Sequence, residues 1–199
     1  FDNESSYSIG CITVDPNNPN TVCVGTGANN NQRSVAYGDG IYKSLDGGKS
    51  WKNMGLKNSE HIGNIIVHPD NSDVVYVSVY GPLWNKGGDR GIYKTVNGGK
   101  TWDKILYVDE HTGFNEIHMD PRNSDVLYAA SHQRRRHVYT YVGGGPGSGL
   151  HKSSDGGKTW KKINKGLPSV EIGRIGMDIS DADPEVIYAI VEASDRKGG

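Results

Sequence analysis

Apolar and polar residues alternate along four similar stretches of the chain. Each stretch reads as a strand pattern, a turn rich in Asp, Asn and Pro, and a second strand pattern. A period of two is expected of a strand with one buried face, while Pro, Asn and Asp favour a turn and interrupt a strand ladder. The pattern therefore predicts four β-hairpins, which begin at Ile9, Ile62, Phe114 and Ile172.

A second repeated unit lies between these hairpins. It reads GIYKSLDGGKSW from Gly40, GIYKTVNGGKTW from Gly91 and GLHKSSDGGKTW from Gly149. Because the central glycines accept positive φ and an Asp side chain can accept hydrogen bonds from the amides of its own turn, each copy predicts a further hairpin. The middle copy carries Thr95 and Asn97 in place of Ser and Asp. We expect its turn to keep its shape and to lose a charge.

Two hairpins per repeat give four strands, which we name A to D in chain order. One such unit every 50 to 60 residues is typical of a β-propeller with four-stranded antiparallel blades. The predicted fold class is all-β, with about three and a half blades: residues 9–54, 62–107, 114–163 and a half blade at 172–191. Propellers close with about four to eight blades. We therefore expect the remaining blades of a parent chain, or a partner protein, to cover the two open sides.

The connections between strands B and C are long and differ from one another, whereas the A–B and C–D turns are short and alike. These B–C loops span residues 25–40, 80–91 and 132–149. Variable loops on a rigid scaffold are where binding residues are usually placed, and substitutions in exposed loops usually cost under about 0.5 kcal/mol. The candidate ligand-binding residues are Arg33, Tyr37, Trp84, Arg90, Arg134, Arg135, Arg136 and Tyr139.

The arginine run of the third loop has three readings. Together with His132 and His137 it could hold a carboxylate, sulfate or phosphate through bidentate guanidinium contacts. A solvated loop and a contact to a neighbouring domain are the alternatives. Trp84 differs from the other tryptophans because it does not recur in the repeats. We expect its substitution, and that of residues 134–136, to weaken binding and to leave the thermal midpoint nearly unchanged.

The spacing Ser-x-Asp-x-Gly-x-x-Trp resembles the Asp box of the bacterial neuraminidase repeat. With the Asp-Pro-Asn hairpins it resembles the Asp-box propeller superfamily, and within it the sortilin-type and xyloglucanase-type repeat proteins. Even repetition and turn chemistry favour a structural role for these residues over a catalytic one, and the tryptophans are expected in equivalent buried places. The Asp-box residues are Ser44, Asp46, Gly48, Trp51, Thr95, Asn97, Gly99, Trp102, Ser153, Asp155, Gly157 and Trp160.

The resemblance implies an exported, extracytoplasmic protein and leaves two functions open. The favoured one is a module that binds a protein or glycan partner through its B–C loops without chemistry. The alternative is part of a xyloglucanase-like glycoside hydrolase, which needs two carboxylates beside the scissile bond. The sequence pairs no two of the loop acids Asp39, Asp89, Asp109 and Glu110, and the arginine triad of sialidases has no match.

Composition argues against several other classes of protein. A formal charge of -1 and a pI near 6.7 provide no basic field for nucleic acid, and no apolar run is long enough to span a bilayer. The seven histidines lack zinc-like spacing and the Asn-rich loop lacks the carboxylates of a calcium loop, so neither a metal nor a cofactor is expected. Cys11 and Cys23 lie in the two strands of one hairpin. A cross-strand disulfide and two free thiols are both compatible with this placement.

Overall fold

A computed structural model shows an all-β chain, which we describe for residues 1–163 and 165–195. The first blade is the sheet β1 (Ile9–Asp15), β2 (Asn18–Thr26), β3 (Ile41–Ser44) and β4 (Lys52–Asn53). The second is β5 (Ile62–His68), β6 (Asn71–Val79), β7 (Gly91–Thr95) and β8 (Asp103–Leu106). Among these residues no helix is long and apolar enough to cross a membrane.

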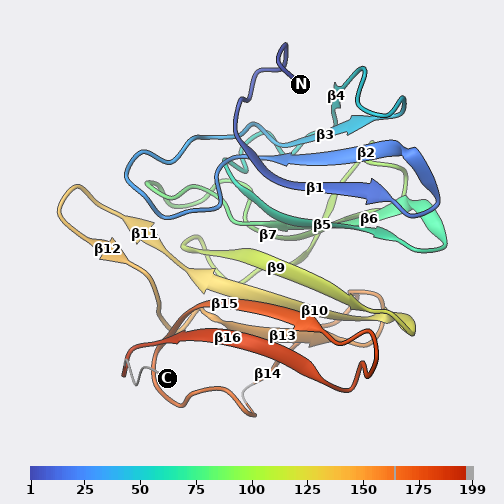
Figure 1. Cartoon of the computed structure of the whole chain (residues 1–199). Coiled ribbons are helices and arrows are strands. Elements are labelled where there is room, and N and C mark those ends of the chain that lie inside the picture. Colours follow the sequence, from blue (N-terminus) through green and yellow to red (C-terminus); the bar gives the residue numbers. More distant parts are fainter. Residues whose placement is uncertain (164, 196–199) are drawn as a thin grey trace.

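The third blade carries an insertion. It is formed by β9 (Thr112–Asp120), β10 (Asn123–Gln133), β13 (Gly149–Ser153) and β14 (Lys161–Ile163). Between β10 and β13, strands β11 (Arg135–Arg136) and β12 (Tyr141–Val142) make a small hairpin, which projects from the blade (Figure 1). A half blade follows, formed by β15 (Ile172–Ile179) and β16 (Ile187–Ala193). The antiparallel order A-B-C-D confirms the predicted partial propeller.

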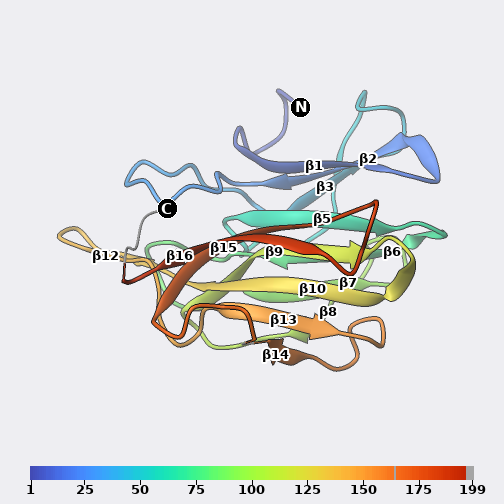
Figure 2. The same ribbon diagram turned by 60° about the horizontal axis from the view of Figure 1, so that its bottom comes forward.

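The hydrophobic core lies between the blades. Strands β1, β5, β9 and β15, the first of each blade, contact one another in chain order (Figures 1 and 2). One cluster joins Cys23 and Ile41 of the first blade to Ile65 of the second, and two similar clusters fill the next two seams. Along β5 the buried Ile65 and Val67 alternate with half-buried residues, whereas β6 is buried continuously from Val75 to Val79 because its two faces meet different neighbours.

The two end faces stay open. Ile12 is 64% exposed, whereas Ile65, which holds the same place in the second blade, is 2% exposed against the first. At the other end Tyr188 is 68% exposed, whereas the equivalent Tyr76 is 2% exposed. The expectation that further blades or a partner protein cover these faces stays a prediction.

The C–D turns have the hydrogen bonding that their sequence indicates. In the first, Asp46 Oδ1 accepts from the amides of Lys49 and Ser50 at 3.0 and 2.9 Å, and Ser44 Oγ accepts from the Gly48 amide at 2.8 Å. A hydrogen bond from the Ser50 hydroxyl, with those from the Ser50 amide and the Ser44 hydroxyl, lowers the pKa of Asp46. In the second turn Asn97 Oδ1 replaces the carboxylate and accepts from Thr101, so the shape is kept without the charge. These hydrogen bonds hold each turn in shape, and the expectation that the residues have a structural role alone stays a prediction.

The recurring tryptophans occupy equivalent places and are half-buried, where full burial had been expected. Trp102 Nε1 donates to the Met54 carbonyl of the preceding blade at 2.8 Å, and Trp160 packs in the seam before its own blade. Trp51 has no blade before it within the chain and meets Phe1 edge-on, with ring centroids 5.3 Å apart. Each indole thus packs toward the preceding neighbour.

The Cys11–Cys23 disulfide is not formed, and both thiols are free. Cys11 lies opposite Gly25 and Cys23 opposite Thr13, because the hairpin is irregular at its turn and does not fold symmetrically about Asn17. Residues two positions out of register are too far apart for the Cβ separation of about 3.5–4.5 Å that a disulfide needs. Burial raises the pKa of Cys11 to about 12.

Candidate functional site on the B–C face

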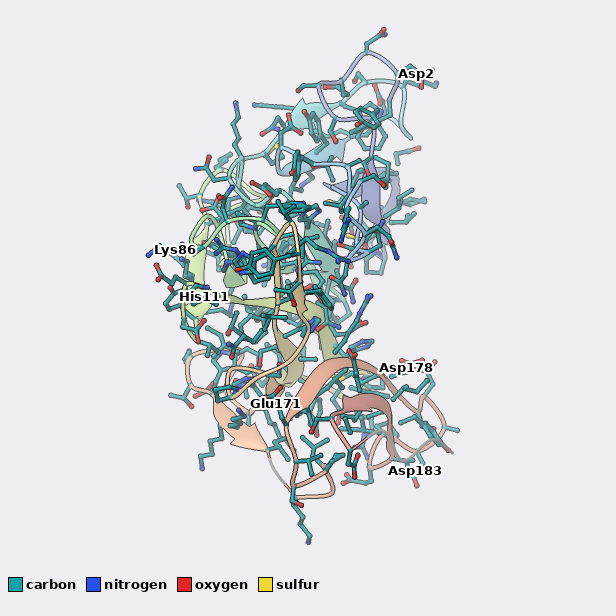
Figure 3. All side chains as sticks on the ribbon, turned by 90° about the vertical axis from the view of Figure 1, so that its left-hand side faces the viewer. Asp2, Lys86, His111, Glu171, Asp178 and Asp183 are labelled. Atoms are coloured by element: carbon teal, nitrogen blue, oxygen red, sulfur yellow. The ribbon has the colours of Figure 1, made fainter. Side chains whose placement is uncertain are left out.

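All three B–C loops emerge at one end of the blades, and the A–B and C–D turns emerge at the other. In Figure 1 the B–C end is on the left, and Figure 3 looks directly onto it. This arrangement follows from strand direction, because each antiparallel sheet sends strand B back to the end where strand A began. We call this surface the B–C face.

The first and third loops are fastened together by Arg134. Its side chain is fully buried, and its Nη1 donates to the carbonyl of Asn30 at 3.2 Å and to Oδ1 of Asn31 at 2.8 Å. Nη2 donates to the carbonyl of Gly81 in the second loop at 3.3 Å. The guanidinium also lies over the ring of Tyr80, 3.3 Å from its centroid. One side chain therefore ties all three loops together.

Two further arginines reach the same Asn-rich segment. Arg136 donates from Nε and Nη2 to the carbonyl of Asn31, and the Nε contact is 3.1 Å. Arg174 of β15 donates to the carbonyl of Asn29 at 3.2 Å. Backbone carbonyls at residues 29–31 thus face cations from the third blade and the half blade. Because a guanidinium offers five donors in fixed directions, it can hold several carbonyls at once.

A buried chain of hydrogen bonds holds the tyrosine ring on which Arg134 stacks. The hydroxyl of Tyr80 hydrogen-bonds to Nδ1 of His132, and His132 Nε2 lies 3.0 Å from the carbonyl of Gly143. A carbonyl only accepts, so Nε2 carries the proton and Nδ1 accepts from the tyrosine. Burial lowers the pKa of His132 to about 4, which keeps the imidazole neutral. These hydrogen bonds fix the ring on which Arg134 stacks.

Arg90 organises the second loop. It is fully buried, and its guanidinium donates to the carbonyls of Tyr80 at 2.9 Å, Gly87 at 2.9 Å and Asn85 at 2.8 Å, with a further bond to Pro82. Arg134 is likewise buried, which corrects the expectation that its substitution leaves the thermal midpoint nearly unchanged. Both are buried because an irregular loop leaves backbone carbonyls that need donors.

Glu60 and His61 lie under the junction of the loops. His61 is fully buried, its Nε2 is 4.0 Å from Glu60 Oε2, and neither nitrogen has a hydrogen-bond partner among the described residues. Burial, with the cation of Arg134 adding to it, lowers the pKa of His61 to about 3, and burial raises the pKa of Glu60. Glu60 also has a φ of 52°, an uncommon value for a residue other than glycine.

A cationic pocket opens on the B–C face between the second and third blades. Its volume is about 410 Å³. Lys86 and His111, labelled in Figure 3, lie on one side of it. Glu110 is the single carboxylate in the wall, 3.1 Å from Lys86 Nζ and 3.6 Å from His111 Nε2. The pocket is lined by Lys86, Glu110, His111, Gln133, Arg134, Arg135, His137 and Val142.

The other predicted binding residues lie around this pocket and beyond it. Tyr139 is 85% exposed at the tip of the β11–β12 hairpin, where its ring stacks on His137. Tyr37 is 52% exposed and Arg33 is exposed, both in the first loop. Trp84 is half-buried in the second loop. The structure thus brings Arg134 and Arg135 into one pocket and leaves Arg33, Tyr37 and Tyr139 outside its wall.

The loop acids are held by their own surroundings. Asp39 accepts from the hydroxyls of Tyr42 and Ser5, both at 2.7 Å. Asp89 accepts from the Asn58 amide at 3.1 Å, and Asp109 accepts from the His111 amide at 2.8 Å. None of these contacts joins two carboxylates.

Sequence reasoning missed Glu60 and Arg174 as parts of this face, and it placed Tyr80 in the second loop without singling it out. Arg174 lies inside a regular strand, so its position carries no local signal. Glu60 stands in a short D–A connection with the sequence of an ordinary polar turn. Their importance arises from loops that meet across blades.

The fold and this face define a β-propeller segment with a built loop surface. The chain matches the Sortilin-Vps10 family model, described as "Sortilin, neurotensin receptor 3", over residues 39–198. The match covers most of the sequence, and the chain belongs to this family. A search of curated proteins by sequence finds no match.

Solved structures show the same fold. An ancestral GH74 enzyme is similar with a TM-score of 0.65 and 18% identity, over 92% of this chain. The GH74 enzyme of Niastella koreensis gives a TM-score of 0.55 at 22% identity over 78% of the chain, and the GH74 xyloglucanase of Xanthomonas campestris gives 0.56 at 21% over 79%. In each case the chain spans 22% of the length of the solved protein. At these identities the likeness concerns the fold alone.

Proposed function

We propose that this chain is part of an extracytoplasmic propeller that binds a protein or glycan partner on its B–C face, with no chemistry of its own. The observation that carries the proposal is the cationic pocket between the second and third blades. Five of its eight lining side chains are Lys, Arg or His, against the single carboxylate of Glu110. Such a wall favours an anionic group of the partner, a carboxylate, a sulfate or a phosphate.

The pocket has donors to offer. The side chain of Arg135 makes no hydrogen bond among the described residues, whereas both Nη atoms of Arg134 and two nitrogens of Arg136 are occupied by loop carbonyls and Asn31. Arg135 is therefore the guanidinium we expect to meet the anion. Lys86 adds a point charge at the rim, where its side chain is 63% exposed.

Preorganisation supports the same conclusion. Arg134 and Arg136 hold the first loop against the third through bonds between residues about a hundred positions apart in the chain. A loop that is already ordered loses less conformational entropy when a partner binds. The neighbouring hairpin tip presents Val138 and Tyr139, 78% and 85% exposed, as an apolar contact beside the charged pocket.

The test is a binding titration with two probes, a Glu-rich peptide and a sulfated disaccharide. Arg135→Ala and Lys86→Ala should each weaken binding, by about tenfold or more for Arg135, because a hydrogen bond to a charged group contributes about 1.5–3 kcal/mol. Lys49→Ala, a lysine at the opposite end of the blades, is the matched control. Unchanged affinity in Arg135→Ala for the probe that binds would refute the assignment.

One observation favours the alternative, a glycoside hydrolase whose cleft further blades complete. Glu60 is a largely buried carboxylic acid with a raised pKa on the B–C side, which is what a general acid requires. The GH74 neighbours, one of them titled a xyloglucanase, share the fold. Hydrolysis of xyloglucan that disappears in Glu60→Gln while the protein stays folded would favour the enzyme over the binding module.

A further inference from the structure

The seam between the first and second blades differs from the seam that follows it. In each blade a lysine of strand C stands directly across from a residue of strand B: Cys23–Lys43, Tyr76–Lys94 and Tyr128–Lys152. The ammonium groups of Lys94 and Lys152 each lie 5.0 Å from the centroid of the opposite tyrosine ring. Lys43 has no such ring, because Cys23 replaces the tyrosine.

The tyrosine closes the seam between the second and third blades. The hydroxyl of Tyr76 donates to the carbonyl of Gly156, in the C–D turn of the next blade, at 3.1 Å. Lys94 Nζ donates to the same carbonyl at 3.0 Å. In the preceding seam the corresponding turn residue is Gly98. The Cys23 side chain is too short to reach it, and Lys43 Nζ makes no hydrogen bond among the described residues.

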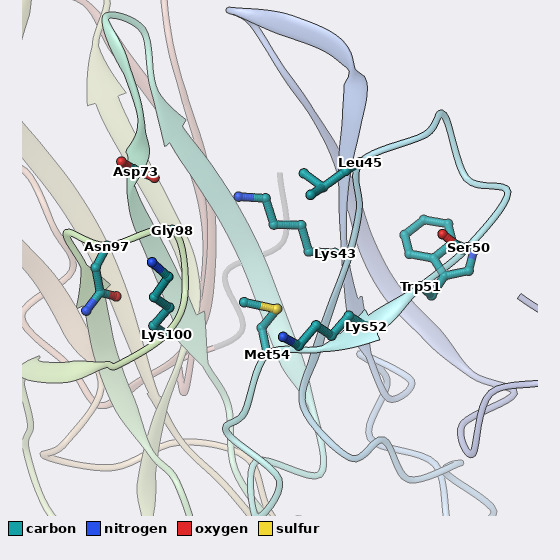
Figure 4. A pocket seen from close by; sticks show the side chains of 10 residues that line it. All are labelled: Lys43, Leu45, Ser50, Trp51, Lys52, Met54, Asp73, Asn97, Gly98 and Lys100. Carbon is teal, nitrogen blue, oxygen red and sulfur yellow. The ribbon is translucent and has the colours of Figure 1, made fainter.

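A cleft of about 350 Å³ lies between the first two blades, on the end opposite the B–C face. In Figure 4, Lys43 and Lys52 extend from β3 and β4 toward the turn that carries Lys100. A small inner recess that includes Cys23 shares Lys43, Met54 and Gly98 with the cleft wall. The cleft is lined by Lys43, Leu45, Ser50, Trp51, Lys52, Met54, Asp73, Asn97, Gly98 and Lys100.

The cleft carries unbalanced positive charge. Its three lysines face one carboxylate, that of Asp73, and none of them takes part in an ion pair among the described residues. Asn97, the second residue that departs from the repeat, also lies at this cleft. Asn97 lines the cleft where the other two turns have an aspartate, so a carboxylate is missing from its wall. Asn97 thus makes the cleft more cationic, while Cys23 lines the small recess that shares part of the cleft wall.

We propose that this cleft binds a small organic anion, with its acidic group at the lysines and an apolar body against Leu45 and Met54. The volume lies in the range of small-molecule sites, about 300–1,000 Å³. A lysine is a flexible point charge, so it suits a carboxylate, a sulfate or a phosphate equally well. This site is separate from the partner surface on the B–C face and does not depend on it. It departs from the expectation that all contacts fall on that face.

Three probes distinguish the chemistry: 2-naphthoate, naphthalene-2-sulfonate and the neutral 2-naphthamide, titrated into the isotope-labelled protein. We expect amide shifts at Gly98 and Gly99 with the anions, and about tenfold or more weaker binding of the amide, since the charged hydrogen bond is lost. The anion that binds more tightly, the carboxylate or the sulfonate, identifies the acidic group that the cleft prefers. Equal affinity of the neutral probe, or shifts confined to the exposed end faces, would overturn the proposal.

Variants then test the two irregularities separately. Cys23→Tyr should weaken binding, because a ring in the recess would hold Lys43 over its face, as Tyr76 holds Lys94, and take that ammonium group from the cleft. Asn97→Asp and Lys100→Gln should each weaken binding about two- to fivefold, because exposed charge pairs contribute modestly. Lys158→Gln, at the matching position in the third blade's turn, is the control and should bind as the parent does. If Cys23→Tyr does not fold, Asn97→Asp decides, because it restores the residue of the other two turns; unchanged affinity in that variant refutes the proposal.

Discussion

Replacing Arg134 with alanine should destabilise the protein strongly, in contrast to what an arginine in a loop suggests. The side chain is fully buried and donates to three acceptors, the carbonyl of Asn30 at 3.2 Å, Oδ1 of Asn31 at 2.8 Å and the carbonyl of Gly81 at 3.3 Å. Truncation leaves these acceptors without a donor, at about 1–3 kcal/mol for each one that stays dry. It also removes the cation stacked on Tyr80.

Water can enter the space left by the guanidinium and solvate part of the set, so we take the low end of this range for each acceptor. The expected loss is about 3 kcal/mol of unfolding free energy. For a chain of this size that corresponds to a fall in the thermal midpoint of about 6–12 °C. The loss should appear as faster amide exchange at residues 29–31, since these are the groups that the side chain holds.

The assay is thermal and urea unfolding of Arg134→Ala beside Arg33→Ala. Arg33 is an exposed arginine of the first B–C loop, and its removal should cost under about 0.5 kcal/mol. An Arg134→Ala midpoint that falls no further than that of Arg33→Ala would show that the loops hold together without this side chain. The reasoning from buried carbonyls would then be refuted.

Two further predictions concern the turns and the close approach of blades. The pKa of Asp155 is lowered to about 2 by bonds from Thr159 and Ser153, so its stabilising effect is complete above about pH 4 and is lost as the pH falls toward 2. Acid titration of Asp155→Asn should therefore show a shallower fall in stability than the parent, and parallel curves would contradict this. Gly113→Ala should cost about 2 kcal/mol or more, because its Cβ would meet the Tyr80 carbonyl across the seam, whereas Gly176→Ala, with nothing within 4 Å, should be nearly neutral. Equal urea midpoints for the two variants would contradict the close packing.

The site could be predicted from the sequence only in part. The B–C loops were identified because their sequences differ while the turns repeat, and Arg134 and Arg135 do line one pocket. Local sequence does not show that Arg134 is buried. Its environment is set by Asn30 and Asn31, about a hundred residues away, and by Gly81 in another blade.

Repetition was enough to determine the architecture. Alternating apolar residues and glycine-centred turns fix strand length and reversal locally, so the four hairpins and three C–D turns follow from the chain itself. The exchange of Asp for Asn at residue 97 was also visible in the sequence, and its turn keeps the hydrogen bonds of the others.

Only the tertiary structure decided what the irregular residues do, because their neighbours come from other blades. Cys23 and Asn97 lie far apart in the sequence, yet one stands in the seam and the other in the turn that closes it. The hairpin register that keeps Cys11 from pairing with Cys23 depends on an irregular turn that spacing alone does not reveal. Contacts within a hairpin can be predicted from the local pattern of apolar and turn residues. Contacts between blades depend on how whole sheets pack, which no short stretch of sequence specifies.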